Sequence, residues 1–210
     1  MFRSFISTLA RRGPVSRPGS YSRRTFVFSS PRWATSTTPH SSTSDPAETE
    51  ALRCLELGTS KLEEGDVSAA KELYKRSTDI KRTASSLFNL GVTHYHLKEF
   101  DEAISSWKES ITLQPSSPDA HTNLASAYIM SPVARPDLAL KHLDIASTLS
   151  PDDPEIAFNL AAVLEATGKL EEALEQYQRS KDNGVERAAV HIRNVAAKIL
   201  MREAAEKTSN

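Results

Sequence analysis

The stretch that decides the fold runs from residue 87 to residue 115 and reads LFNLGVTHYHLKEFDEAISSWKESITLQP. Its apolar residues recur at i, i+3, i+4 and i+7 in two runs, which is the spacing of amphipathic helices. A charged turn around Lys98 and Glu99 separates the runs, and Pro115 closes the second one. The stretch therefore predicts two antiparallel helices joined by a short turn.

The same pattern recurs with a period near 34 residues. In each copy a leucine and a small residue precede an alanine, a large apolar residue follows the alanine by four positions, and a small residue comes three further on. In chain order the alanines are Ala70, Ala103, Ala139 and Ala173, the large residues Tyr74, Trp107, Leu143 and Tyr177, and the last small residues Ser77, Ser110, Ala146 and Ser180. Small residues allow two helices to approach closely, and a large one fills the space between neighbouring hairpins.

This repeat resembles the tetratricopeptide repeat (TPR) family over about residues 51–187. The resemblance implies an all-α fold, an α-solenoid of antiparallel hairpins, with units at about 51–83, 84–117, 118–153 and 154–187. The first unit departs most from the family pattern, because Lys61 stands where an aromatic residue is usual and Arg82 where proline is usual. We expect it to be a terminal, more solvated unit.

Two further features are an insertion in the third unit and a helix after the fourth. The leucine-to-alanine spacing is thirteen residues in the other units but fifteen between Leu124 and Ala139, so we expect a two-residue insertion in a stiff, proline-containing turn at residues 131–137. A helix at about residues 185–206 is expected to cap the exposed face of the fourth unit. Its apolar stripe consists of Ala189, Ile192, Val195, Ala196 and Ile199.

The first 33 residues differ in composition from the rest. They hold seven arginines and no lysine, and the first acidic residue of the chain is Asp45. An Arg-rich, Ser-rich and acid-free N-terminus is typical of a mitochondrial transit peptide, which we predict for residues 1–33. Residues 24–29 resemble the two-step mitochondrial processing motif, implying a cut after Thr25, a second that leaves Ala34 first, and the matrix as destination. The alternatives are a single cut after Trp33 and a basic tail that binds anionic partners.

Residues 34–49 are rich in Ser, Thr and Pro and are predicted to be a disordered linker. Subtracting the seven N-terminal arginines from 26 basic residues leaves 19 against 27 acidic ones, a net charge of −8. Because the residues after 33 carry this negative charge, they are poor candidates for nucleic-acid binding. No stretch approaches the roughly 18 apolar residues of a transmembrane helix.

Residues that could carry chemistry are few. The sequence lacks a glycine-rich phosphate loop, a nucleophile elbow and a zinc-protease helix. His94 and His96 are two positions apart, so they leave a helix on different sides and are poorly placed to share a metal ion. The single cysteine, Cys54, is interpreted as a packed core residue. We therefore predict no enzyme activity, no cofactor and no metal site.

The resemblance places a peptide-binding groove on the first helices of the units. Its residues are Phe88, Asn89, Val92 and Tyr95 in the second unit, Asn123, Ile129 and Met130 in the third, and Phe158 and Asn159 in the fourth. Asn89, Asn123 and Asn159 share one repeat position. Such amides can hold an extended backbone by donating and accepting hydrogen bonds, or they can simply orient the helices, and both interpretations stay open.

A subclass of the family grips the C-terminal carboxylate of cytosolic chaperones. The corresponding positions here are Leu55, Thr59, Asn89, Asp119 and Asn123. Only Asn89 fits, and Asp119 would repel a carboxylate. The sequence therefore argues against a chaperone-docking receptor.

The predicted function is that of a mitochondrial adaptor or scaffold, holding an extended or amphipathic segment of another protein in the groove. By family analogy, it could serve the assembly of a respiratory or other mitochondrial complex. The alternative is a stable regulatory or structural subunit of a larger mitochondrial enzyme or ribosome assembly. The sequence does not specify an oligomeric state.

Overall fold

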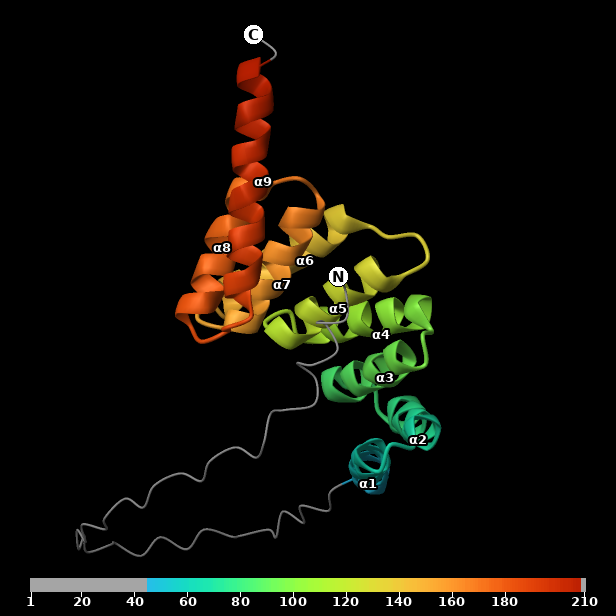
Figure 1. Ribbon diagram of the computed structural model, residues 1–210. Helices are drawn as coiled ribbons and strands as arrows, with labels where there is room; N and C mark the ends of the chain where they lie inside the picture. Colours follow the sequence, from blue (N-terminus) through green and yellow to red (C-terminus); the bar gives the residue numbers. More distant parts are fainter. Residues whose placement is uncertain (1–44, 209–210) are drawn as a thin grey trace, which may run out of the picture. The chain divides into compact units, whose positions relative to one another are not determined.

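The computed structural model describes residues 45–208, which form helices joined by short turns (Figure 1). In chain order the helices are α1 Pro46–Glu63, α2 Val67–Ile80, α3 Ala84–His96, α4 Phe100–Leu113, α5 Pro118–Met130, α6 Pro136–Leu149, α7 Pro154–Ala166, α8 Leu170–Asp182 and α9 Ala188–Thr208. Successive helices pack in pairs from α1–α2 to α7–α8, and α9 packs on α8. The predicted all-α solenoid of antiparallel hairpins is confirmed. The predicted transit peptide and linker residues 34–44 lie outside the described residues.

Each hairpin closes around one large side chain of its second helix. Tyr74, Trp107, Leu143 and Tyr177 are all buried, as are the alanines four positions before them. In the second unit the Trp107 indole Nε1 donates a hydrogen bond to the carbonyl oxygen of Phe88 at 3.0 Å. The large residue of the repeat therefore lies against the first helix of its own hairpin, whereas the sequence pattern predicted that it would fill the space between neighbouring hairpins.

A serine ties the two ends of three hairpins together. The hydroxyl groups of Ser77, Ser110 and Ser180 donate to the carbonyl oxygens of Ala51, Ala84 and Pro154, each at 2.8 Å. Each bond joins the end of the second helix to the start of the first. The third unit has Ala146 at this position and cannot form the bond. Three repeats thus share a hydrogen bond between their two helices in addition to the apolar contact.

The turns inside the hairpins need a left-handed residue. Gly65 and Gly168 supply it in the first and fourth units, with φ values of 85° and 82°. Lys98 occupies the equivalent position in the second unit with φ of 63°, where a side chain is strained. The third unit instead uses the loop 131–135, which carries the exposed Val133. The predicted two-residue insertion therefore forms a surface loop.

Three predicted boundaries need correction. Helix α1 begins at Pro46, so residues 46–49 are helical and not linker, because proline suits the first turn of a helix. Pro136 and Asp137 start α6 and are not part of the preceding turn, for the same reason. The final helix spans 188–208 and not 185–206, because a turn with Gly184 at φ of 104° precedes it.

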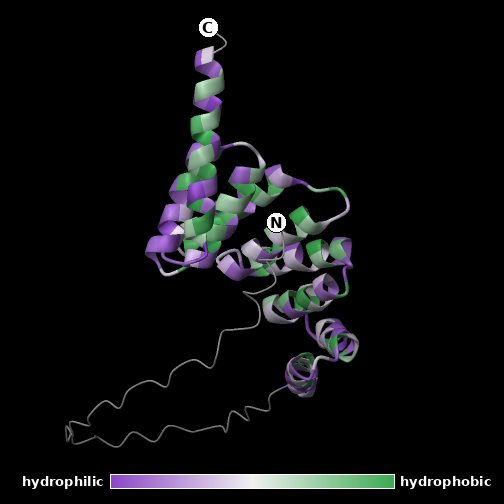
Figure 2. Ribbon diagram, viewed as in Figure 1, coloured by the Kyte–Doolittle hydropathy of each residue, from purple (hydrophilic) through white to green (hydrophobic). Residues whose placement is uncertain are grey.

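Figure 2 shows polar and apolar residues interleaved along the helices of the array, as expected for amphipathic helices. In α9, Ala188 and Val195 are fully buried, while Ile192, Ala196 and Ile199 are partly buried. The predicted capping contact on α8 is therefore present. None of the described helices is long and apolar enough to cross a membrane.

Candidate functional site

The predicted groove residues of the second and third units lie on α3 and α5, two helices that contact each other. We call the surface formed by these two helices the α3–α5 face. Asn89 is half-buried on it, and Asn123 is 8% exposed. The side-chain nitrogen of Asn123 is buried without a hydrogen-bond partner. A buried amide N–H left unpaired is costly and calls for an acceptor, from water or from a ligand.

A hollow of about 340 Å³ opens at the N-terminal end of this face. It is lined by Ala84, Ser85, Phe88, Asn89, Ser110, Gln114, Ser117 and Asp119. Asp119 is the one charged side chain among them, and it forms no ion pair with the part of the chain that the structure describes. The volume of the hollow lies near the lower end of the range for ligand pockets, roughly 300–1,000 Å³. The hollow can therefore take one long side chain or a short stretch of peptide.

The predicted apolar groove residues divide into two groups. Phe88, Ile129 and Met130 are half-buried, and Phe88 lines the hollow. Val92 and Tyr95 are buried in the core. The Tyr95 ring packs edge-on against the Phe100 ring and lies beside Trp107. Burial raises the pKa of the Tyr95 hydroxyl group. Only the first group offers surface to a partner.

In the fourth unit, α9 covers the predicted groove. Phe158 and Asn159 are 2% and 3% exposed. The guanidinium carbon of Arg187 lies 4.4 Å from the centre of the Phe158 ring, and the His191 ring lies 5.2 Å from it. Neither Phe158 nor Asn159 offers surface to a ligand in this arrangement. The part of the predicted groove that remains accessible is the α3–α5 face.

Ion pairs hold α9 in this position. Lys198 donates to Glu165 of α7 at 2.7 Å, and Arg202 pairs with Glu171 of α8. Burial disfavours ionisation of Glu165, but hydrogen bonds from Lys198 and Tyr177 outweigh it and lower the pKa of that carboxyl group. Arg187, just before the helix, pairs with Glu155. Sequence reasoning identified the cap but did not predict the ion pairs of its basic residues with Glu155 and Glu165 of α7.

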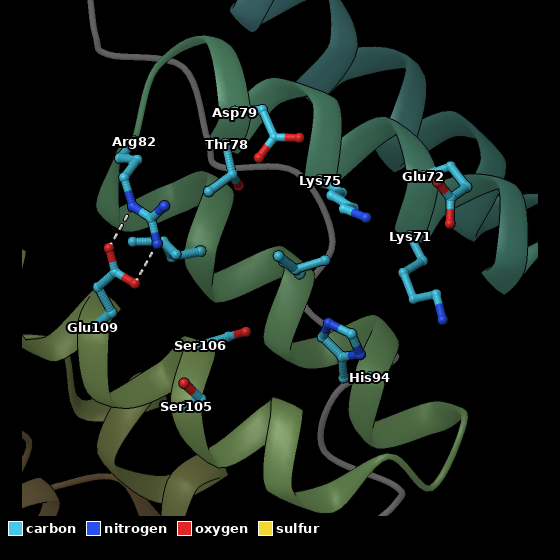
Figure 3. Close-up of a pocket in the computed structure, with 12 residues that line it drawn as sticks. Lys71, Glu72, Lys75, Thr78, Asp79, Arg82, His94, Ser105, Ser106 and Glu109 are labelled. Carbon is cyan, nitrogen blue, oxygen red and sulfur yellow. Dashed lines mark hydrogen bonds and ion pairs between the residues drawn. The ribbon is translucent and has the colours of Figure 1, made fainter.

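A second hollow, of about 330 Å³, lies between α2 and α4 (Figure 3). Leu87 and Leu90 of α3 line it together with polar and charged residues of α2 and α4. Arg82 and Glu109 bridge it with two hydrogen bonds of 2.6 Å, drawn as dashed lines in Figure 3. Acidic and basic side chains are mixed along its walls, so its charge favours no single class of ligand. Sequence reasoning did not identify this hollow, because its residues come from three helices.

His94, His121 and His142 make contacts within the fold. His94 Nδ1 lies 2.6 Å from Glu99 Oε2, while His96 is exposed. His121 Nε2 lies 3.1 Å from the carbonyl oxygen of Pro115, which can only accept, so this nitrogen carries the proton. His121 Nδ1 must then accept a hydrogen bond from His142 Nδ1, 2.9 Å away. The pair thus joins α5 to α6 in its neutral form.

The described residues hold no group of three or more His, Cys, Asp or Glu side chains arranged to bind a metal ion. Cys54 is buried, and burial raises the pKa of its thiol, which disfavours the reactive thiolate.

Comparisons with known proteins agree with this architecture. Residues 94–130 match a family described as "TPR repeat", and residues 133–185 match one described as "Tetratricopeptide repeat". These two stretches are therefore TPR repeats. No curated protein sequence matches it.

Several solved structures share the fold. A crystal structure of MamA is 24% identical, covers 75% of this chain and 87% of its own, and superposes with a TM-score of 0.67. YrrB, described as a TPR protein with an unusual peptide-binding site, is 19% identical, with coverage of 73% and 79% and a TM-score of 0.64. The first TPR of Spaghetti (RPAP3), bound to an HSP90 peptide, is 24% identical, with coverage of 57% and 94% and a TM-score of 0.53. At these identities the likeness shows the fold.

Proposed function

We propose that this protein is an interaction scaffold that holds an extended segment of a partner protein on the α3–α5 face. The observation that carries the proposal is the hollow of about 340 Å³ that Phe88 and Asn89 line at the open end of this face. An extended peptide presents a carbonyl oxygen every few ångströms and can supply the acceptor that the Asn123 nitrogen lacks once the side chains covering that nitrogen move aside. Asn89, half-buried on the neighbouring helix, offers a second amide to the same backbone.

The partner's side chains have apolar surface to contact beside these amides. Phe88 lines the hollow, and Ile129 and Met130 are half-buried at the far end of α5. Apolar side chains exposed along a groove are typical anchors for bound segments. The descriptions of YrrB and of the RPAP3 complex name peptide binding by proteins of this fold, which supports the same class of function here.

The test is capture of partners by the immobilised full-length chain, identified by crosslinking and mass spectrometry. We expect Asn89→Ala together with Asn123→Ala to reduce recovery of the specific partner at least fivefold. Asn194→Ala, on the exposed side of α9, serves as the matched control and should leave recovery unchanged. Equal recovery by the double variant and the control would contradict binding through these amides.

We further propose that the protein works in the mitochondrial matrix and is processed to begin at Ala34. The support is the composition of residues 1–33, with seven arginines and no acidic residue, together with the motif at residues 24–29. Determination of the N-terminus of the mature protein from mitochondria tests this address. A protein that retains residues 1–33 and fractionates outside mitochondria would overturn it. We also propose that the protein acts as an assembly factor for a respiratory or other mitochondrial complex.

The second candidate is a stable subunit of a larger mitochondrial enzyme or ribosome assembly. Leu200 and Met201 of α9 favour it. Their side chains are apolar and are 65% and 72% exposed, so they could pack against another subunit. A stable subunit should co-sediment with a large complex and remain there when both asparagines are replaced. Replacing Leu200 and Met201 by glutamine should release it, whereas release by the asparagine variant would favour the scaffold.

A further inference from the structure

We propose that the hollow at the N-terminal end of the α3–α5 face binds an arginine side chain, so that the scaffold selects basic extended segments. The inference rests on the proposed function and adds the chemistry of the partner. Asp119 is its starting point. This carboxylate is exposed at the edge of the hollow, and no ion pair to it is found among residues 45–208.

Two basic side chains just before α3 are already paired with carboxylates. Lys81 Nζ lies 2.6 Å from Glu48 Oε1, and Arg82 makes two hydrogen bonds of 2.6 Å to Glu109. A bound carboxylate would meet the negative charge of Asp119, and neither Lys81 nor Arg82 is free to offset it. An acidic segment is disfavoured at this position.

The helix ends around the hollow also have little to offer an anion. Thr83 Oγ1 accepts a hydrogen bond from the backbone N–H of Ser86, and Ser117 Oγ accepts one from Ala120. These caps satisfy N–H groups that an anion would otherwise bind at the start of α3 and α5. Charge and hydrogen-bonding capacity therefore favour a cationic donor.

The remaining lining suits a guanidinium group. Asn89 and Gln114 present side-chain amide oxygens that can accept hydrogen bonds, and Phe88 presents an aromatic ring. Arginine has five donors and no acceptor, pairs with a carboxylate through two parallel hydrogen bonds, and stacks on aromatic rings. Lysine could satisfy the charge but offers neither the planar fork nor the stacking surface. The hollow of about 340 Å³ has room for one such side chain.

The position of Asn123 connects this site with the backbone-binding site. Asn123 follows Asp119 by four residues on α5, so the two side chains lie one above the other on one face, about 6 Å apart at Cβ. A segment whose backbone carbonyl accepts from Asn123 can therefore place the side chain of a neighbouring residue beside Asp119. One segment can use both groups at once.

The experiment uses the full-length chain and four randomised nonapeptide libraries in which the central residue is fixed as Arg, Lys, Gln or Glu. We expect the wild-type chain to retain the Arg library about tenfold more than the Glu library, with Lys between them. Asp119→Asn should lower the Arg preference to about twofold, and Asp119→Lys should reverse it. Asp101→Asn, in the first turn of α4, is the matched control and should behave as wild type. Circular dichroism confirms folding of each variant.

The outcomes separate this inference from the proposed function. Equal retention of the Arg and Glu libraries, or a preference for Glu, with binding still lost in the Asn89→Ala/Asn123→Ala variant, would overturn the arginine site and leave the scaffold standing. Retention of every library at the level of the double variant would overturn both. An Arg preference that survives Asp119→Asn would overturn the assignment to this hollow.

Discussion

At the scale of single residues, two glycines explain how bulky aromatic residues fit inside a hairpin. A Cβ atom on Gly91 would lie 2.6 Å from Trp107 Nε1, and one on Gly58 would lie 2.7 Å from Tyr74 Cε1. The third unit pairs Ala125 with the smaller Leu143. In the first three units the size of the residue on the first helix therefore compensates for the size of the residue on the second. The fourth unit departs from this pattern, because it combines Ala161 with Tyr177.

Gly91→Ala should lower the free energy of unfolding by about 2 kcal/mol, because its methyl group would overlap the Trp107 indole. Urea denaturation measures the change. Gly91→Ala combined with Trp107→Leu reproduces the pair found in the third unit and serves as the control. Its loss of stability should be smaller than the sum of the two single losses. Additive losses would show that the overlap is relieved in another way.

Lys98→Gly should raise the free energy of unfolding by about 1 kcal/mol, because glycine adopts the left-handed conformation of this turn without strain. The reverse change in the fourth unit, Gly168→Ala, should lower stability by a similar amount. Thermal denaturation of both variants provides the measurement. A lower melting temperature for Lys98→Gly would mean that its side chain supports the turn by more than the strain costs.

At the scale of helices, the His121–His142 pair links α5 to α6 and makes the third unit sensitive to acid. Burial, with the nearby charges of His121, Lys141 and Lys108, lowers the pKa of His142 to about 4, and burial also lowers the pKa of His121. An unfolded histidine has a pKa near 6.5. The unfolded chain therefore binds protons first as the pH falls, which favours unfolding.

The free energy of unfolding should consequently decrease as the pH falls from about 6.5 to about 4, by roughly 2 kcal/mol from His142 once solvent screening of its exposed edge is allowed for. Urea denaturation at several pH values measures this slope. His142→Asn should flatten it, whereas His96→Asn, at an exposed position, should leave more of it in place. An unchanged slope in His142→Asn would assign the acid sensitivity to other groups.

At the scale of the whole array, α9 completes the fold and limits the groove. It buries Ala188 and Val195 and lies over Phe158, whose neighbours in space include His191 and Arg187. In a repeat array each unit is stabilised mainly by its neighbours, so the last unit depends on its cap. The same contact removes the fourth unit from the surface available to a peptide.

Ending the chain at residue 184 should destabilise the array by about 3 kcal/mol or more and promote aggregation, because it exposes Phe158 and Tyr177. Calorimetry and light scattering measure both effects. Ending it at residue 202 removes exposed residues while keeping the pairing of Arg202 with Glu171, and it should leave stability nearly unchanged. Equal stability of both truncated chains would contradict a capping role for the buried half of α9.

The helical hairpins could be predicted from the sequence because they depend on local spacing. Ala103, Trp107 and Ser110 lie on one side of one helix, and the structure buries all three. The groove could be predicted only as a set of repeat positions. Asn89 and Asn159 share one such position, yet the first is half-buried on an open face and the second is covered at the end of the array.

The sequence by itself therefore determined the repeat, its four units, the insertion in the third and the presence of a final helix. These follow from small and large residues a few positions apart, whose contacts form within one helix pair. Only the tertiary structure decided which groove positions remain open and where the hollow beside Asp119 lies. That outcome depends on contacts such as Lys198 with Glu165, 33 positions apart, and on helix ends from three segments meeting beside Asp119. Local periodicity does not encode those contacts, because they arise from the packing of one hairpin on the next.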